Sequence, residues 1–177
     1  MVEDIELETN GYDFKFNEQP GGITKVIEGV GKDVKTVVNT KGGKQSYSPF
    51  AFHLLDPEFL KDFFTDDKFI ERITLYMRSR EKYYLRQAII EISQENSYVL
   101  DGIFEIAKVL KEGAEKYQTN NWRLVPAEQH VNHAITHYLA HKAGDTQDSH
   151  LTHCICRLMM AYATEESQGF DYTKPMV

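Results

Sequence analysis

The chain has 177 residues, with 20 basic and 27 acidic side chains and a formal net charge of −7. This length suits one domain with a core of its own, so folding requires neither disulfides nor a structural metal. The acidic balance argues against stable nucleic-acid binding, which uses clustered cations to replace phosphate counterions. It does not exclude a small phosphorylated ligand, which needs only two or three local cations.

The location of the protein is indicated by what the sequence lacks. Its longest apolar runs are only a few residues long, and its first residues, MVEDIELETNGYDF, show no basic-then-apolar leader. Cys154 and Cys156 lie two apart in a predicted helix, where they point in different directions and cannot pair. We therefore expect a cytoplasmic protein with reduced thiols and no membrane contact.

The N-terminal zone, residues 1–48, carries most of the glycines. Two β-branched runs, at 23–27 and 34–38, flank a Gly-Val-Gly-Lys-Asp segment. This pattern predicts a β-hairpin between the two runs, and a partly ordered arm is the alternative. We assign 1–48 to an N-terminal arm or hairpin.

Helical periodicity begins at Pro49 and continues through residues 49–166. Caps, prolines and turn residues divide this domain into helices that start at Asp56-Pro57 or cover 66–80, 81–95, 99–117, 126–142 and 148–165. Residues 167–177 are expected to form a C-terminal strap. The predicted fold is mainly α, a bundle of five to six helices with a short N-terminal β-hairpin or arm.

The helix predicted over 148–165 differs from the others because it is apolar on nearly every side. A helix of this kind is buried, so we expect it to be the central helix of the bundle. Its polar residues, His150, His153 and Arg157, then require partners inside the protein.

Histidines are concentrated in one region, since six of the seven fall between residues 130 and 153. On the helix over 126–142, His130, His137 and His141 form a band beside the core stripe, and His153 is expected to face them from the buried helix. Such a band can hold metal ligands or phosphate-binding donors. The alternative is a set of half-buried imidazoles that cover the edge of the core.

Two aspartates, Asp145 and Asp148, flank the turn into the buried helix. An aspartate at a helix start commonly caps backbone amides, and we expect one of the two to do so. A pair of carboxylates beside histidines also suits Mg²⁺ or Mn²⁺ and the alignment of a water. The spacing does not fit a closed tetrahedral zinc site.

Two loops offer groups that suit a nucleotide. The segment 41–46, Lys-Gly-Gly-Lys-Gln-Ser, supplies backbone amides together with Lys44 and Ser46, although it lacks the spacing of a P-loop and a bare glycine turn is the alternative. The segment 116–123 supplies cations, amides and rings for phosphate and base: Lys116, Tyr117, Asn121, Trp122 and Arg123. A compatible interpretation makes Trp122 a hydrophobic plug and Asn121 a turn residue.

Several short strings occur in the order found in one family: 41–46, 54–57, 113–117 and 121–123, followed by His137, Gly144, Asp145, Asp148 and His153. Together they resemble phage-borne dATP/dGTP diphosphohydrolases, and more narrowly the helical domain described as their N-terminal part. The resemblance covers about residues 40–56 and 99–163, so 60–97 looks like an insertion of two helices. Thr136 stands where an arginine often precedes the histidine, and Asp145 replaces a glutamate.

The resemblance implies metal-dependent hydrolysis of a purine deoxynucleoside triphosphate to the monophosphate and pyrophosphate. In that interpretation Asp145 and Asp148 hold Mg²⁺ or Mn²⁺, and His153 or His137 assists the attacking water. The expected substrate-binding residues are Lys44, Ser46, Lys116, Tyr117, Asn121, Trp122 and Arg123.

Two other classes of function are compatible with the sequence. One is a non-catalytic phage protein that binds a nucleotide or a host protein in the host cytoplasm. The other is a structural or interaction protein that works through the inserted helices and the C-terminal strap. The helix over 81–95 has enough apolar surface for a homo-oligomer interface, and packing within the chain explains that surface equally well.

Overall fold

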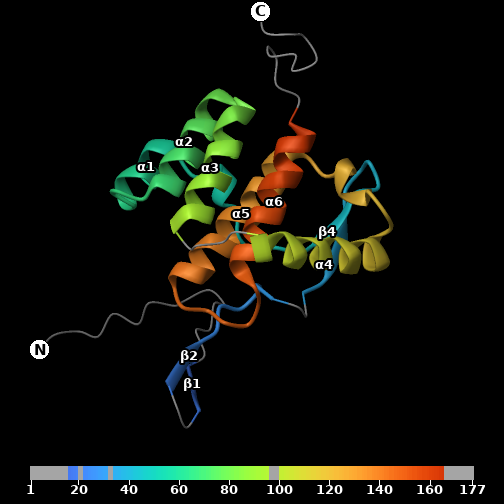
Figure 1. Ribbon diagram of the computed structural model, residues 1–177, viewed down its shortest axis with the longest axis horizontal. Coiled ribbons are helices and arrows are strands. Elements are labelled where there is room, and N and C mark those ends of the chain that lie inside the picture. Colours follow the sequence, from blue (N-terminus) through green and yellow to red (C-terminus); the bar gives the residue numbers. More distant parts are fainter. Residues whose placement is uncertain (1–15, 20–21, 32–33, 96–99, 166–177) are drawn as a thin grey trace, which may run out of the picture.

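The computed structural model describes residues 16–19, 22–31, 34–95 and 100–165 (Figure 1). Its architecture is mainly α, as predicted, and each helix begins within two residues of the expected position. The helices are α1 (Pro57–Phe63), α2 (Lys68–Ser79), α3 (Lys82–Glu95), α4 (Leu100–Tyr117), α5 (Ala127–Lys142) and α6 (His150–Thr164). The strap expected over 167–177 lies outside the described residues.

The helix boundaries follow local signals in the sequence. The Asp56 carboxylate accepts a hydrogen bond from the Phe59 amide at 3.0 Å, and Asp67 caps α2 in the same way through the amide of Ile70. Arg80, at the end of α2, adopts a left-handed conformation with φ of 59°. This residue ends the helix and allows the chain to turn directly into α3.

Helix α6 is the central element, as its apolar composition predicts. The helices α3, α4 and α5 all pack against it, and Figure 1 shows it surrounded by them. Cys154 and Leu158 on α6 are fully buried in the core. The ring of Tyr138 on α5 stacks on Phe69 of α2 with 4.0 Å between centroids, which joins the α2 layer to the same core.

The described part of the predicted insertion, residues 60–95, packs into this core. Ile73 on α2 and Leu85 and Ile92 on α3 are fully buried in the cluster that contains the α6 side chains. The apolar face of α3 is therefore covered by packing within the chain. This is the alternative to a homo-oligomer interface that the sequence left open for this helix.

The N-terminal zone forms two local hairpins instead of the predicted one. Strand β1 (Phe16–Gln19) pairs with β2 (Gly22–Lys25), and β3 (Thr36–Val38) pairs with β4 (Lys44–Ser46), both antiparallel. The expected pairing of 23–27 with 34–38 is therefore wrong.

The local turn at residues 39–43 explains the difference. The Asn39 side chain accepts hydrogen bonds from the amides of Lys41 and Gly43, and Gly42 takes a positive φ of 81°. These contacts favour closure of β3 onto β4. Residues 29–31 run against the helices instead of forming a hairpin turn, and Val30 is only 6% exposed.

Two short 3-10 helices connect the larger elements, η1 (Phe52–Leu54) and η2 (Asn121–Leu124). No helix within the described ranges combines the length and the apolar character that a membrane crossing requires.

Candidate functional site

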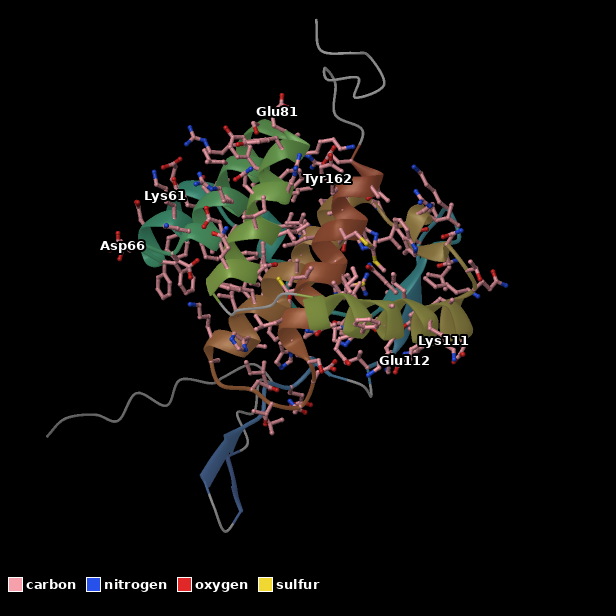
Figure 2. The ribbon with its side chains drawn as sticks, viewed as in Figure 1. Lys61, Asp66, Glu81, Lys111, Glu112 and Tyr162 are labelled. Carbon is pink, nitrogen blue, oxygen red and sulfur yellow. The ribbon has the colours of Figure 1, made fainter. Side chains whose placement is uncertain are left out.

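A cavity of about 520 Å³ lies among α4, α5, α6, strand β4, residues 29–31 and Val34. Glu112 of α4 lies at its rim, whereas Figure 2 shows Lys61 and Glu81 on the other side of the molecule, on the α1–α3 layer. None of the described side chains of α1, α2 and α3 lines the cavity. The helices of the 60–97 segment therefore support the site from behind without forming its wall.

The cavity brings together eight of the residues singled out in the sequence: Lys44, Ser46, Lys116, Tyr117, Trp122, His137, Asp148 and His153. Three others, Asn121, Arg123 and Asp145, do not line it. His141, one of the predicted histidine band, is also absent from the lining, while His133 is part of it.

Arg157 on α6 is the cavity residue with the most unusual surroundings. Its Nη1 lies 3.2 Å from Nδ1 of His130, a neutral acceptor. Within the described part of the chain, the arginine–carboxylate pairs involve Arg72, Arg78 and Arg80 but not Arg157. Burial lowers the pKa of this guanidinium, which still remains charged because arginine titrates far above neutral pH. Arg157 is half-buried, and a partly desolvated cation without a carboxylate partner is stabilised by an anion that binds beside it.

The β3–β4 loop presents Lys44 to the same cavity. The Asn121 side chain accepts a hydrogen bond from the Lys44 amide at 2.6 Å and donates one to the Gly42 carbonyl at 3.1 Å. Gly43 allows this close approach, since a Cβ there would lie 2.6 Å from the carbonyl oxygen of Leu124. Asn121 thus fixes the loop from outside the cavity, a role closer to the predicted turn residue than to a base-reading amide.

Tyr117 at the end of α4 contacts the loop through Ser46, whose hydroxyl lies 3.1 Å from the Tyr117 phenol. Burial opposes ionisation of Tyr117, but hydrogen bonds with Ser46, Lys116 and Thr36 outweigh it and lower the pKa of the phenol. Lys116 therefore adds a second cation to the lining beside Lys44.

Trp122 packs as the plug interpretation expects, and its position in the cavity lining is compatible with the predicted contact to a base. It is half-buried, packs against the hydrophobic core and also lines the cavity. The guanidinium of Arg123 lies over the indole, 4.4 Å from the ring centroid, but this side chain is exposed outside the cavity. One ring therefore closes the space between η2 and α5 and offers an aromatic surface to the cavity.

Two predicted catalytic histidines meet in the cavity. The rings of His137 and His153 stack with centroids 4.9 Å apart and planes inclined by 18°. Nε2 of His153 lies 3.1 Å from Oδ1 of Asp148. Partial burial opposes ionisation of Asp148, but the hydrogen bond to His153 dominates and lowers the pKa of the carboxyl to about 2.

A second histidine–aspartate pair, His150 and Asp145, contacts His137 on the side away from the cavity lining. Nδ1 of His137 lies 3.0 Å from Nδ1 of His150, whose Nε2 lies 2.9 Å from Oδ1 of Asp145. Burial and the neighbouring imidazoles lower the pKa of His137 well below the ordinary value, so the ring is neutral at neutral pH. Nε2 of His137 is therefore the nitrogen that can contact a ligand.

Asp145 itself is enclosed by donors. Besides His150, its carboxylate accepts hydrogen bonds from the amides of Ile27 and Gln147 and from the Gln147 side chain. These bonds lower the pKa of Asp145 against the opposing effect of burial. They also occupy both oxygens, so Asp145 organises the turn before α6 and ties the N-terminal segment to it.

The predicted aspartate pair is a poor metal centre in this geometry. In the residues that the structure describes, no group of three or more His, Cys, Asp and Glu side chains is arranged to hold a metal ion. Asp148 alone of the pair faces the cavity. One carboxylate suits Mg²⁺ only when substrate phosphates supply other ligands, which is the usual arrangement for this ion.

The sequence did not assign Arg157 and His133, which line the cavity, or His150, which contacts His137 behind it, to the site; His130 was expected in the histidine band but lies outside the lining. A signal was present, because polar side chains on a helix that is apolar all round require partners. That signal does not reveal which partner each one has. The hydrogen bond between Arg157 and His130 depends on the packing of α5 against α6.

Comparison with known proteins supports the family resemblance. Residues 93–172 match the family model described as dATP/dGTP diphosphohydrolase, N-terminal, which confirms the resemblance predicted from the sequence. The match includes α4, α5 and α6 with their histidines and aspartates, whereas the strings before residue 93 lie outside it. No curated protein and no solved structure matches the chain.

Proposed function

We propose that the cavity binds a purine deoxynucleoside triphosphate and hydrolyses it to the monophosphate and pyrophosphate. The observation that carries this proposal is Arg157, a half-buried guanidinium that lines the cavity and, among the residues that the structure describes, has a neutral imidazole and no carboxylate as its hydrogen-bond acceptor. The family match names dATP and dGTP, and it covers the helix that carries Arg157.

The triphosphate would bind at the cationic part of the cavity. Lys44, Lys116 and Arg157 line it and outnumber the two carboxylates of the lining, Glu112 and Asp148. Arginine suits phosphate because its planar donors can bond two oxygens at once. Burial strengthens the attraction, since the surroundings screen charge less than water does.

The base would stack on the aromatic side chains of the same cavity, which lie close to its cations, since Lys116 Nζ is 5.0 Å from the Tyr117 ring centroid. Trp122 and Tyr117 both line the cavity, and each offers a ring of the size that a purine can cover. Asn120, also in the lining, supplies an amide that could bond a base edge.

In the proposed chemical step a water oxygen attacks the α-phosphorus and the bond between that phosphorus and the bridging oxygen to the β-phosphate breaks. Pyrophosphate leaves, and Nε2 of His137 accepts the proton of the water. A bound triphosphate raises the basicity of His137, because negative charge favours the imidazolium. A Mg²⁺ or Mn²⁺ ion bound to the phosphates would have Asp148 as its protein ligand and would neutralise phosphate charge.

A second candidate is a non-catalytic protein that binds the nucleotide, or a host protein, without turnover. It is favoured by the single carboxylate that the predicted pair presents to the cavity, fewer than most metal-dependent hydrolases use. Either candidate implies a cytoplasmic protein, since deoxynucleotides are made and used there.

One experiment separates these functions. The parent protein is incubated with each of the four dNTPs, with and without Mg²⁺, and the products are separated by anion exchange while affinity is measured by calorimetry. We expect dATP or dGTP to give a monophosphate and pyrophosphate in the presence of Mg²⁺. Binding without product would support the second candidate, and the absence of both would overturn the proposal.

Arg157→Met tests the observation that carries the proposal. Methionine keeps an unbranched side chain of similar length but removes the charge and the donors. We expect the dNTP affinity to fall by roughly a hundredfold. Arg86→Met, at an exposed position on α3, is the matched control and should leave affinity unchanged.

A further inference from the structure

His130 lies directly behind the cation that faces the cavity. The side chain is fully buried on α5 and does not line the cavity. Its Nε2 is 3.0 Å from the backbone carbonyl oxygen of Trp122, and its Nδ1 is 3.2 Å from Nη1 of Arg157. The His130 imidazole therefore connects Trp122, which offers an aromatic surface to the cavity, with Arg157, which offers a guanidinium.

The hydrogen positions on this imidazole follow from its two partners. A carbonyl oxygen can only accept, so Nε2 of His130 carries the hydrogen and donates it to Trp122. A guanidinium can only donate, so Nδ1 of His130 is unprotonated and accepts from Arg157. Burial and the charge of Arg157 lower the pKa of His130 to about 3, which agrees with this neutral form.

We propose that His130 is a positioning residue that aims Arg157 into the cavity while leaving its full charge to an anionic ligand. This inference rests on the proposed function, since it concerns how the same site binds phosphate. A carboxylate at this position would orient the guanidinium equally well but would also neutralise it. A neutral imidazole provides the orientation alone.

The same imidazole ties phosphate binding to the placement of Trp122. Trp122 lies in η2, the element that also holds the β3–β4 loop through Asn121. Movement of η2 would withdraw the Trp122 carbonyl from His130 and thereby loosen the acceptor of Arg157. His130 thus links the aromatic and cationic parts of the cavity through one hydrogen-bonded chain.

The test compares three variants with the parent, using calorimetry with inorganic tripolyphosphate and with dATP. His130→Leu fills the space but removes the acceptor, whereas His130→Asn keeps one acceptor and one donor. His141→Leu is the control, because this histidine is on the same helix but does not line the cavity or contact Arg157 in any described bond. All variants are first checked for a cooperative melting transition.

We expect His130→Leu to weaken binding of both ligands by roughly ten- to a hundredfold, because a hydrogen bond to a charged group is lost. His130→Asn should recover most of that loss, and His141→Leu should bind like the parent. Equal binding by the parent and His130→Leu would overturn the inference while leaving the proposed function intact. If the parent binds neither ligand, the proposed function fails, and the role of His130 in ligand binding fails with it.

A spectroscopic measurement on the parent keeps the inference testable if His130→Leu does not fold. The ¹⁵N chemical shifts of the imidazole distinguish a protonated from an unprotonated ring nitrogen. We expect a protonated Nε2 and an unprotonated Nδ1 for His130 at neutral pH, with and without tripolyphosphate. The opposite tautomer, or a doubly protonated ring, would overturn the inference because neither could accept from Arg157.

Discussion

The imidazole of His137 stacks on that of His153, with centroids 4.9 Å apart and planes inclined by 18°. The two rings differ in their partners, since His153 is bonded to Asp148 in the cavity wall and His137 to the buried His150. This difference gives them separate roles in the proposed reaction. His137 receives the proton, and His153 holds Asp148 in place.

His137→Ala should therefore lower the turnover of dATP by about a hundredfold or more, the usual contribution of a general base, with a small change in dATP affinity. His153→Ala should weaken the Mg²⁺ dependence and affinity together, because Asp148 loses its partner. Steady-state kinetics and calorimetry on both variants measure the two effects. Equal loss of turnover and affinity in both would contradict the separate roles.

The α2–α3 layer should contribute stability without contributing to ligand binding. Phe69 is fully buried and stacks on Tyr138, but it does not line the cavity. Phe69→Ala should lower the free energy of unfolding by about 3–5 kcal/mol, the usual cost of removing a buried aromatic ring. Urea denaturation measures this cost, and the dATP affinity of the folded variant should match that of the parent. A variant that lacks residues 60–97 and still folds would contradict the integral role of this layer.

The helices could be predicted because their signals are local. Asp56, Asp67 and Pro126 mark starts, and the apolar composition of α6 indicates its central place. The strand pairing could not be predicted in the same way, because β-branched runs do not specify a partner. The side chain of Asn39 and the positive φ of Gly42 select the β3–β4 pairing, and their effect depends on the three-dimensional turn.

The sequence predicted which types of residue form the site better than it predicted the role of each residue. Lys44, Trp122 and His137 carry groups suited to a nucleotide, and the structure gathers them in one cavity. Asp145 was expected to hold a metal, but the structure surrounds it with donors, including the amide of Ile27 far away in the sequence. A sequence pattern does not show that contact, nor that Arg157 has a neutral acceptor, since both arise from packing between distant segments.

The buried histidines predict an acid-sensitive fold. The pKa of His130 is lowered to about 3, and those of His133 and His137 are well below the ordinary value, mainly through burial. The unfolded chain takes up protons near pH 6.5 whereas the folded chain does not, so the stability from these neutral rings is complete above that pH and falls as the pH decreases. Each ring should cost about 2 kcal/mol of stability between pH 7 and pH 5.

Urea denaturation of the parent at pH 7 and pH 5 measures this loss. His130→Leu removes one of the three groups, so its loss over the same interval should be smaller by about 2 kcal/mol. His141→Leu, in which a partly exposed ring is replaced, should lose nearly as much as the parent. An equal pH dependence in the parent and His130→Leu would mean that His130 is protonated in the folded protein.

The two aspartates of the turn before α6 should respond differently to replacement by asparagine. At Asp148, an asparagine oxygen can still accept from His153 and from the Ser149 amide, so melting at pH 7 should stay near that of the parent. Loss of the charge should nevertheless reduce Mg²⁺-dependent hydrolysis at least tenfold, because hard cations prefer carboxylate oxygens. At Asp145, the new amide group must face a donor, since His150, Ile27 and Gln147 surround the carboxylate.

An unsatisfied donor pair of this kind costs about 1–3 kcal/mol, so Asp145→Asn should melt clearly below the parent even without Mg²⁺ or nucleotide. Calorimetric melting and a pyrophosphate-release assay, each with and without Mg²⁺, separate the two effects. If the two aspartates have these roles, Asp145→Asn lowers the melting temperature and Asp148→Asn lowers the Mg²⁺-dependent rate of hydrolysis. If Asp148→Asn hydrolyses dATP with the Mg²⁺ dependence of the parent, Asp148 is not the metal ligand. If Asp145→Asn melts like the parent, its four hydrogen bonds do not stabilise the turn as the geometry indicates, and its carboxylate is again a candidate for the metal.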